Sequence, residues 1–129
     1  MYKGIIIIVI IIVIIVLLNC ITQNYTKETI VILKENLNKM RSDFLEEEIN
    51  EDKIRQDIEN TVNEWNKRYE ILAYYIEHDE LEKVENDLTM IKSNIDAKEY
   101  GEGVEHIDSC VFLINHIGDK EAVNIRNIF

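Results

Sequence analysis

The stretch IIIIVIIIVIIVLL, residues 5–18, is the part of this chain that decides its fold. No charged residue lies between Lys3 and Lys27, and the apolar run continues through Cys20 and Ile21 to about 17 residues, the lower limit for crossing a bilayer. β-Branched residues favour strands in water, but in hydrocarbon every backbone N–H and C=O group needs an internal partner, so a single segment becomes a helix. The sequence therefore predicts an N-terminal membrane anchor. The residues that mark it are Ile5, Ile8, Ile12, Ile15 and Leu18.

Composition limits what the remainder of the chain can be. The chain has 129 residues, so the part after the anchor is long enough for one compact domain with one modest core. The chain carries 25 acidic and 14 basic side chains, which gives a formal net charge of −11. This excess of negative charge argues against nucleic acid as a partner and against docking flat on anionic lipid.

Charges on either side of the anchor predict its orientation. Lys3 and the α-amine precede the anchor, whereas the mixed pair Lys27 and Glu28 follows it, so the positive-inside rule places the N-terminus in the cytoplasm and the domain outside. We therefore expect a single-pass anchor in the cell membrane. An alternative stays open, because residues 17–20, LLNC, are similar to a bacterial lipobox, in which the cysteine, here Cys20, is lipidated and becomes the new N-terminus. The asparagine departs from that pattern, since its position normally takes Gly, Ala or Ser.

Beyond the anchor, apolar residues recur at steps of three and four, which predicts helices throughout. A first helix is expected over residues 26–47, continuing directly from the anchor because no Pro or Gly intervenes. The acidic elbow, residues 46–52, should end this helix and stay solvated. Asn50 is the expected N-cap of a second helix that ends near His78. The apolar stripe of the first helix consists of Ile30, Leu33, Leu37, Met40 and Phe44.

Two further helices are expected. Asp79 should open the third, with Glu82 three residues on as in a capping box. The Gly-Glu-Gly stretch at residues 101–103 should interrupt the helical pattern. A fourth helix should then run over residues 104–117, with Gly118 closing it as a left-handed cap.

These patterns predict an all-α protein with a single N-terminal transmembrane helix followed by an antiparallel three- to four-helix bundle, because short connections make consecutive helices antiparallel neighbours. We divide the chain into an anchor over residues 1–24, a juxtamembrane helix or stalk over 25–49 and a bundle domain over 50–129. The first helix could equally be a fourth member of the bundle. The expected core positions are Trp65, Tyr69, Leu72, Leu88, Ile91, Val111 and Ile114.

Three features together resemble one protein family. They are Trp65 on a long helix, the sequence His78-Asp79-Glu80 before the next helix, and the ending Asn-Ile-Phe at residues 127–129. This order is similar to the short, N-terminally anchored bacterial proteins of the family called domain of unknown function 4363. The likeness covers the whole chain. It implies a membrane-associated helical protein of unassigned activity and brings no catalytic residues with it.

Few residues offer chemistry. His78 and His116 are expected at helix C-termini on the same end of the bundle, where each would offset the negative end of a helix dipole. A pH-responsive or metal-binding pair is the alternative interpretation. The Glu-x-x-His pairs of a di-iron bundle are missing from the sequence, and Cys110 is expected to be a small buried apolar residue. We therefore expect no enzyme, no cofactor and no metal.

Two classes of function remain. The first is a non-enzymatic interaction or scaffold module that holds an acidic face above the membrane and binds a membrane or envelope protein. Self-association belongs to this class, since the stripe from Ile30 to Phe44 suits a partner helix. The second class is an extracytoplasmic sensor of pH, a cation or a small ligand that uses His78 and His116. Because so few residues precede the anchor, a sensor would need another protein to pass on its signal.

Overall fold

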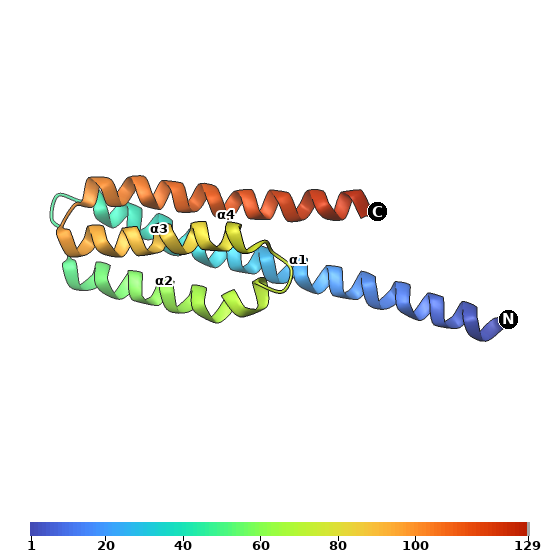
Figure 1. Cartoon of the computed structure of the whole chain (residues 1–129). Helices are drawn as coiled ribbons and strands as arrows, with labels where there is room; N and C mark the ends of the chain where they lie inside the picture. Colours follow the sequence, from blue (N-terminus) through green and yellow to red (C-terminus); the bar gives the residue numbers. More distant parts are fainter. Residues whose placement is uncertain (129) are drawn as a thin grey trace.

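Helices make up nearly all of the computed structural model, which describes residues 1–128 (Figure 1). These residues contain no strand, which confirms the predicted all-α class with a long apolar N-terminal helix before a helical bundle. Phe129 and the side chains of residues 124–128 lie outside the description, and with them the side chains of the Asn-Ile-Phe ending. The four helices are α1 (Tyr2–Phe44), α2 (Glu51–Leu72), α3 (His78–Ala97) and α4 (Tyr100–Ile128).

α1 is one uninterrupted helix of 43 residues that joins the apolar stretch to the bundle. Between Ile5 and Leu18 every side chain is exposed, and α1 projects from the bundle over this length (Figure 1). By length and composition it is able to cross a membrane. Leaving apolar surface in water costs about 25 cal/mol per Å². The projecting half of α1 is thus suited to hydrocarbon rather than to water.

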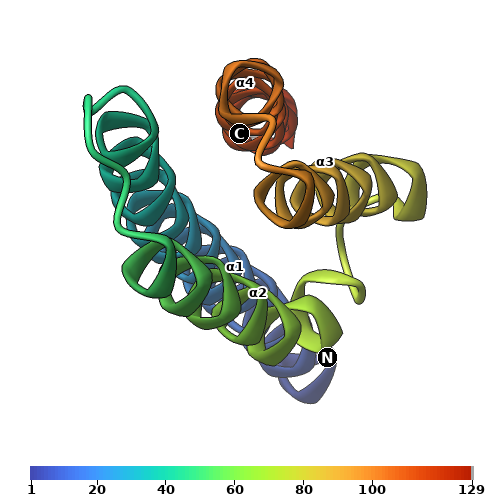
Figure 2. The same ribbon diagram turned by 90° about the vertical axis from the view of Figure 1, so that its left-hand side faces the viewer.

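The second half of α1 is the fourth member of the bundle. From Thr26 onward its buried side chains face α2 and α4, and α3 packs against those same two helices, so the chain runs up, down, up and down. Figure 2 looks along the bundle and shows α1 beside α2, and α3 beside α4. Of the two roles left open for this segment, stalk or bundle member, it therefore has the second. Its apolar stripe faces the core, where Leu33, Leu37, Met40 and Phe44 are buried and Ile30 is partly buried.

The core runs through the centre of the four helices. Trp65 is only 2% exposed and meets Tyr69 edge to face, with ring centroids 6.1 Å apart. Its indole Nε1 donates a hydrogen bond of 3.4 Å to Glu85 Oε1, so the polar edge of the buried ring has a partner. Among the other expected core positions, Leu72, Leu88, Ile91 and Ile114 are buried, whereas Tyr69 and Val111 are partly buried against the core.

The turn between α1 and α2 agrees closely with the prediction from the sequence. α1 ends at Phe44, three residues earlier than expected, and the acidic side chains after it are exposed. Asn50 is the N-cap of α2, as predicted, because its Oδ1 accepts a hydrogen bond of 3.2 Å from the backbone N–H of Lys53. The expected elbow therefore sits at one end of the bundle, with Glu46, Glu47 and Glu48 in water and Glu51 paired with Lys98 at 3.1 Å.

The turn between α2 and α3 differs from the prediction. α2 ends at Leu72 rather than near His78, and His78 is the first residue of α3. The N-cap of α3 is Glu77, whose side chain makes no capping hydrogen bond, so the expected capping box at Asp79 is wrong. Past Leu72 the backbone continues as a turn, in which the Ile76 N–H donates a hydrogen bond of 2.8 Å to the Leu72 carbonyl oxygen, and Ile76 is buried in the core, as its place in the apolar spacing predicts.

The prediction for α4 was wrong at both ends. The glycines at residues 101–103 lie in the first turn of α4, and Gly118 lies inside a helix that continues to Ile128. Both expectations treated glycine as a helix breaker, but Gly103 and Gly118 act here through their small size. A Cβ on Gly103 would lie 2.6 Å from Phe44 Cε2, and one on Gly118 would lie 2.5 Å from Ile30 Cδ1. These glycines therefore let α4 approach α1 closely.

The two glycines of the first turn give a matched test of this explanation. In urea unfolding of the full-length protein in detergent micelles, Gly103→Ala should lower the free energy of unfolding by about 1–3 kcal/mol, because the new methyl group overlaps the buried Phe44 ring. Gly101→Ala is the control, since its Cβ would meet nothing within 4 Å. It should leave stability unchanged or raise it by up to about 1 kcal/mol. Equal effects of the two substitutions would contradict the close-approach explanation.

Candidate functional site

The two histidines singled out in the sequence occupy different surroundings from those expected. His78 begins α3, so it lies at the positive end of a helix dipole and cannot offset a negative one. Its ring stacks on Tyr69, with centroids 6.2 Å apart. His116 lies several turns before the end of α4, stacks on Phe112 and has its Nε2 4.0 Å from Glu80 Oε1. The helix-end interpretation of both histidines is therefore wrong.

Neither histidine lies in a recognisable metal site. Within residues 1–128, no group of three or more His, Cys, Asp and Glu side chains is arranged so that it could hold a metal ion. The third histidine, His106, joins α4 to α3, since its Nδ1 lies 2.9 Å from Asn94 Oδ1. Each histidine thus has its own neighbours in the bundle.

Cys110 is fully buried in α4. Burial raises the pKa of its thiol to about 12, and the nearby Asp87 carboxylate acts in the same direction. At neutral pH the side chain is therefore a protonated thiol rather than a nucleophilic thiolate. It serves as a small apolar core residue, as its sequence context suggested.

A polar contact joins the turn between α2 and α3 to α1, at the end of the bundle from which the apolar helix projects (Figure 1). The Tyr75 hydroxyl lies 2.8 Å from Thr26 Oγ1 and donates a hydrogen bond of 3.2 Å to the Thr22 carbonyl oxygen. We call these three residues the Thr–Tyr joint. Burial raises the pKa of Tyr75, although the hydrogen bond with Thr26 acts the other way. The joint holds this turn beside Thr22 of α1, which is one residue past Ile21, the last residue of the apolar run.

Arg68 of α2 forms a second polar contact with α1. Only 11% of its side chain is exposed, and its guanidinium donates hydrogen bonds to Thr29 Oγ1 at 3.0 Å and to Glu64 Oε1 at 2.8 Å. The same group lies 3.6 Å from Glu28 Oε1 and 5.2 Å from the centre of the Tyr25 ring. A largely buried cation is stable only with such partners, so these contacts hold α2 against the start of the bundle segment of α1.

Sequence reasoning missed both contacts, although a signal for them was present. Arg68 lies three residues after Trp65 and four before Leu72, so it occupies a position in the apolar stripe of α2. Thr26 and Thr29 likewise extend the stripe of α1 at helical steps, and both are buried. Polar residues at stripe positions indicate a buried polar contact, but the stripe alone does not identify their partners.

A charged cluster lies beside the turn between α2 and α3. Lys120 Nζ lies 3.2 Å from Glu77 Oε2 and 3.8 Å from Glu80 Oε1. Glu80 is 8% exposed, and its second carboxylate oxygen is buried with no hydrogen-bond partner among the side chains that the structure describes. Burial raises the pKa of Glu121, and the positive charge of Lys120 acts in the opposite direction. With Tyr75 and Ile117, these residues line a cavity of about 90 Å³. The cluster therefore ties α4 to the same turn as the Thr–Tyr joint.

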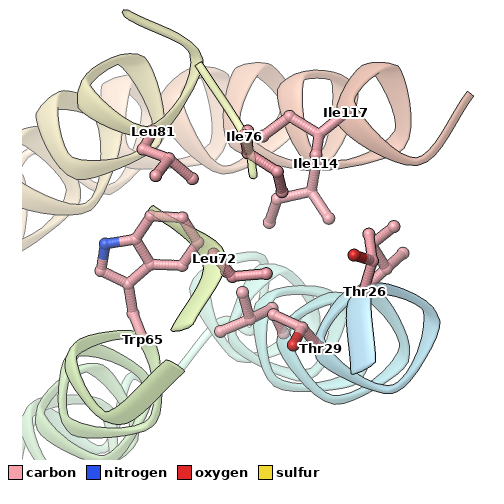
Figure 3. Close-up of a pocket in the computed structure, with 10 residues that line it drawn as sticks. Thr26, Thr29, Trp65, Leu72, Ile76, Leu81, Ile114 and Ile117 are labelled. Carbon is pink, nitrogen blue, oxygen red and sulfur yellow. The ribbon is translucent and has the colours of Figure 1, made fainter. Parts of the chain in front are cut away.

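The interior near this end holds one further small cavity (Figure 3). Its volume is about 10 Å³, comparable with a single water molecule. Figure 3 shows Trp65 and Leu81 on one side of it and Ile114 and Ile117 on another, with Thr26 and Thr29 contributed by α1. Both threonine hydroxyls bond to carbonyl oxygens of α1, so the lining is apolar. A space of this size and character is a packing defect rather than a ligand site.

The Thr–Tyr joint can be tested with two adjacent tyrosines. Tyr75→Phe should lower the free energy of unfolding by about 0.5–1.5 kcal/mol, because the contacts with Thr26 and Thr22 are lost while the ring remains. Tyr74→Phe is the matched control, since Tyr74 is 89% exposed and its hydroxyl is free to bind water. Urea unfolding in detergent micelles measures both. An unchanged stability of Tyr75→Phe would show that the joint does not stabilise the bundle.

Comparison with known protein families places this chain in one of them. A model of the family described as domain of unknown function (DUF4363) matches residues 20–128, which is nearly the whole chain outside the apolar stretch. No curated protein and no solved structure gave a match. The matched region begins at Cys20 and includes the Thr–Tyr joint, Arg68 and all four bundle segments. Since this match covers far more than half of its length, the chain belongs to the DUF4363 family.

Proposed function

We propose that this protein is a single-pass membrane protein whose helical bundle acts as a non-enzymatic interaction module on the outer side of the cytoplasmic membrane. The observation that carries the proposal is the continuity of α1. One helix includes both the apolar stretch, with every side chain exposed, and the buried stripe of the bundle. Because the helix has no break, a bundle built on it is held at a fixed height above the membrane.

Two contacts support the fixed height. The Thr–Tyr joint holds the turn between α2 and α3 to α1, and Arg68 holds α2 to the same part of α1. Both lie within the first turns after the apolar stretch. A flexible tether would leave the bundle free to tumble, whereas these contacts restrict it to the orientation of α1.

The non-enzymatic part of the proposal rests on the roles that polar side chains already have. Ser109 Oγ donates a hydrogen bond to Asp87 at 2.8 Å, which joins α4 to α3. Arg68 and Lys120 hold neighbouring helices together, and the Cys110 thiol is buried and protonated. Groups of this kind stabilise a bundle. We therefore assign them to the fold rather than to a reaction.

The partner in this proposal is another membrane or envelope protein, or a second copy of the chain. The stripe from Ile30 to Phe44, which the sequence offered to a partner helix, is used inside the bundle. Apolar side chains that face outward remain elsewhere. Val31 on α1 is 55% exposed and Phe112 on α4 is 69% exposed. We assign the contact with a partner to the outer faces of these two helices.

The anchor and its sidedness can be tested together. Full-length protein should stay with membranes during an alkaline carbonate wash, because exposed Ile, Val and Leu side chains hold α1 in the bilayer. In a Cys20→Ser background, a cysteine at the exposed Leu45 should react with a membrane-impermeant maleimide in intact cells, while the buried Cys110 should not react. Recovery of the protein in the wash would end the anchor proposal. Labelling only after lysis would reverse the sidedness.

The mass of the purified protein separates the two modes of attachment. An intact Met1 indicates the uncleaved helix that we propose. A lipidated fragment that starts at Cys20 would instead support the lipoprotein.

The proposed partner contact can be tested by cross-linking in cells. A photoreactive amino acid in place of Phe112 should yield one dominant cross-linked product, because this side chain faces outward from α4. The same amino acid at the exposed Lys67 of α2 is the control and should yield none. Mass spectrometry of the product identifies the partner or a second copy of the chain. Absence of a specific product at Phe112 would contradict the interaction module.

A further inference from the structure

The end of the bundle nearest the apolar stretch has features of a lipid-contacting surface. The Thr–Tyr joint places the turn between α2 and α3, residues 73–77, at the level of Thr22, immediately after the apolar run. If the apolar run occupies hydrocarbon, as the proposed function requires, this turn lies where α1 leaves the hydrocarbon. The inference that follows therefore rests on the proposed anchor.

Large apolar and aromatic side chains are exposed at this turn. Tyr74 is 89% exposed, and Ile71, three residues before it, is 47% exposed. Tyrosine is enriched at membrane interfaces because its ring is apolar while its hydroxyl stays in contact with water and headgroups. Adjacent Tyr75 is turned inward by the joint, so Tyr74 is the aromatic residue that the turn leaves outside.

The end of α4 reaches the same region from another side. α4 runs antiparallel to α1, and Gly118 lies against Ile30, so each residue after Gly118 moves α4 toward the apolar stretch. The remaining turns continue to Ile128, a length of about 15 Å at 1.5 Å per residue. Figure 1 shows α4 extending beyond the turn between α2 and α3, toward the side from which α1 projects.

The sequence of this last part of α4 suits an interface. Val123 is 50% exposed, and no acidic residue follows Glu121 in a chain that has 25 acidic side chains. The charges that lie close to the turn are partly neutralised, since Lys120 Nζ is 3.2 Å from the Glu77 carboxylate. Acidic side chains therefore stop before the last turns of α4, which approach the level of the apolar stretch.

We propose that this end of the bundle docks into the interfacial layer of the bilayer, with Tyr74, Ile71 and Val123 among the headgroups and upper acyl chains of neutral lipids. The surface is continuous with the anchor, because the joint and the antiparallel α4 bring both segments to the level where α1 leaves the hydrocarbon. Docking is end-on, so the acidic sides of the bundle stay away from the membrane. Docking would fix the tilt of the bundle relative to the membrane, which the anchor alone would leave free.

The test uses full-length protein in phosphatidylcholine vesicles, with Cys20→Ser as background and single cysteines carrying a nitroxide label. Labels at Tyr74→Cys and Val123→Cys report the proposed surface. A label at Leu45→Cys, exposed at the opposite end of the bundle, and one at Ile12→Cys, within the apolar stretch, are the references. Power-saturation measurements compare collisions with oxygen, which concentrates in the bilayer, and with a water-soluble nickel chelate.

Positions 74 and 123 should show a several-fold loss of nickel collisions relative to position 45, with an oxygen preference between those of positions 45 and 12. Nickel access at 74 and 123 equal to that at 45, with position 12 still protected, would overturn the docking and leave the anchor intact. Nickel access at position 12 as well would overturn the anchor and the docking with it. Protection at 74 that disappears when the protein is diluted in lipid would assign the surface to a second copy, which also overturns the proposal.

Discussion

The structure depends on the unbroken backbone hydrogen bonding of α1 across the border between its apolar and amphipathic halves. A helix with no Pro or Gly after Gly4 has no position at which it bends easily, so the two halves share one axis. Every other element is then placed relative to that axis. α2 and α4 pack against the distal half, and α3 completes the bundle without touching α1 closely. The position of the apolar segment therefore fixes the position of the whole domain.

Apolar contacts hold the bundle, and polar side chains are buried at both of its ends. The distal part buries Asp43 and Asn94 near Met40 and Phe44. The part nearest the apolar stretch buries Thr26 and Thr29 and largely buries Arg68. A guanidinium is costly to move into hydrocarbon. In the proposed single-pass protein, these groups would therefore mark where α1 leaves the hydrocarbon.

The close contact of α4 with α1 has a different origin. Gly103 and Gly118 remove the side chains that would hold the two helices apart, and Phe44 and Ile30 fill the space. Between these points Arg41 Nε lies 2.7 Å from Asp108 Oδ1 on the outer side of the pair. Such an exposed ion pair contributes little to stability, because water and salt screen it. The register of the two helices is thus decided by shape at the glycines more than by charge.

The sequence by itself determined the helical class, the apolar stretch, the Asn50 cap and most of the core, including Trp65 and Ile91, because these follow from local periodicity and composition. Only the tertiary structure decided where α2 ends, that α4 runs through Gly118, and which partners Arg68 and Tyr75 have. His78, expected at the end of the second helix, is the first residue of α3 because α2 ends earlier, at Leu72. Periodicity states which face of a helix is buried, but helix ends and buried polar partners depend on side chains that only packing brings together. The sequence predicted that Gly118 would cap a helix, whereas in the folded chain it lies inside α4 and packs against Ile30.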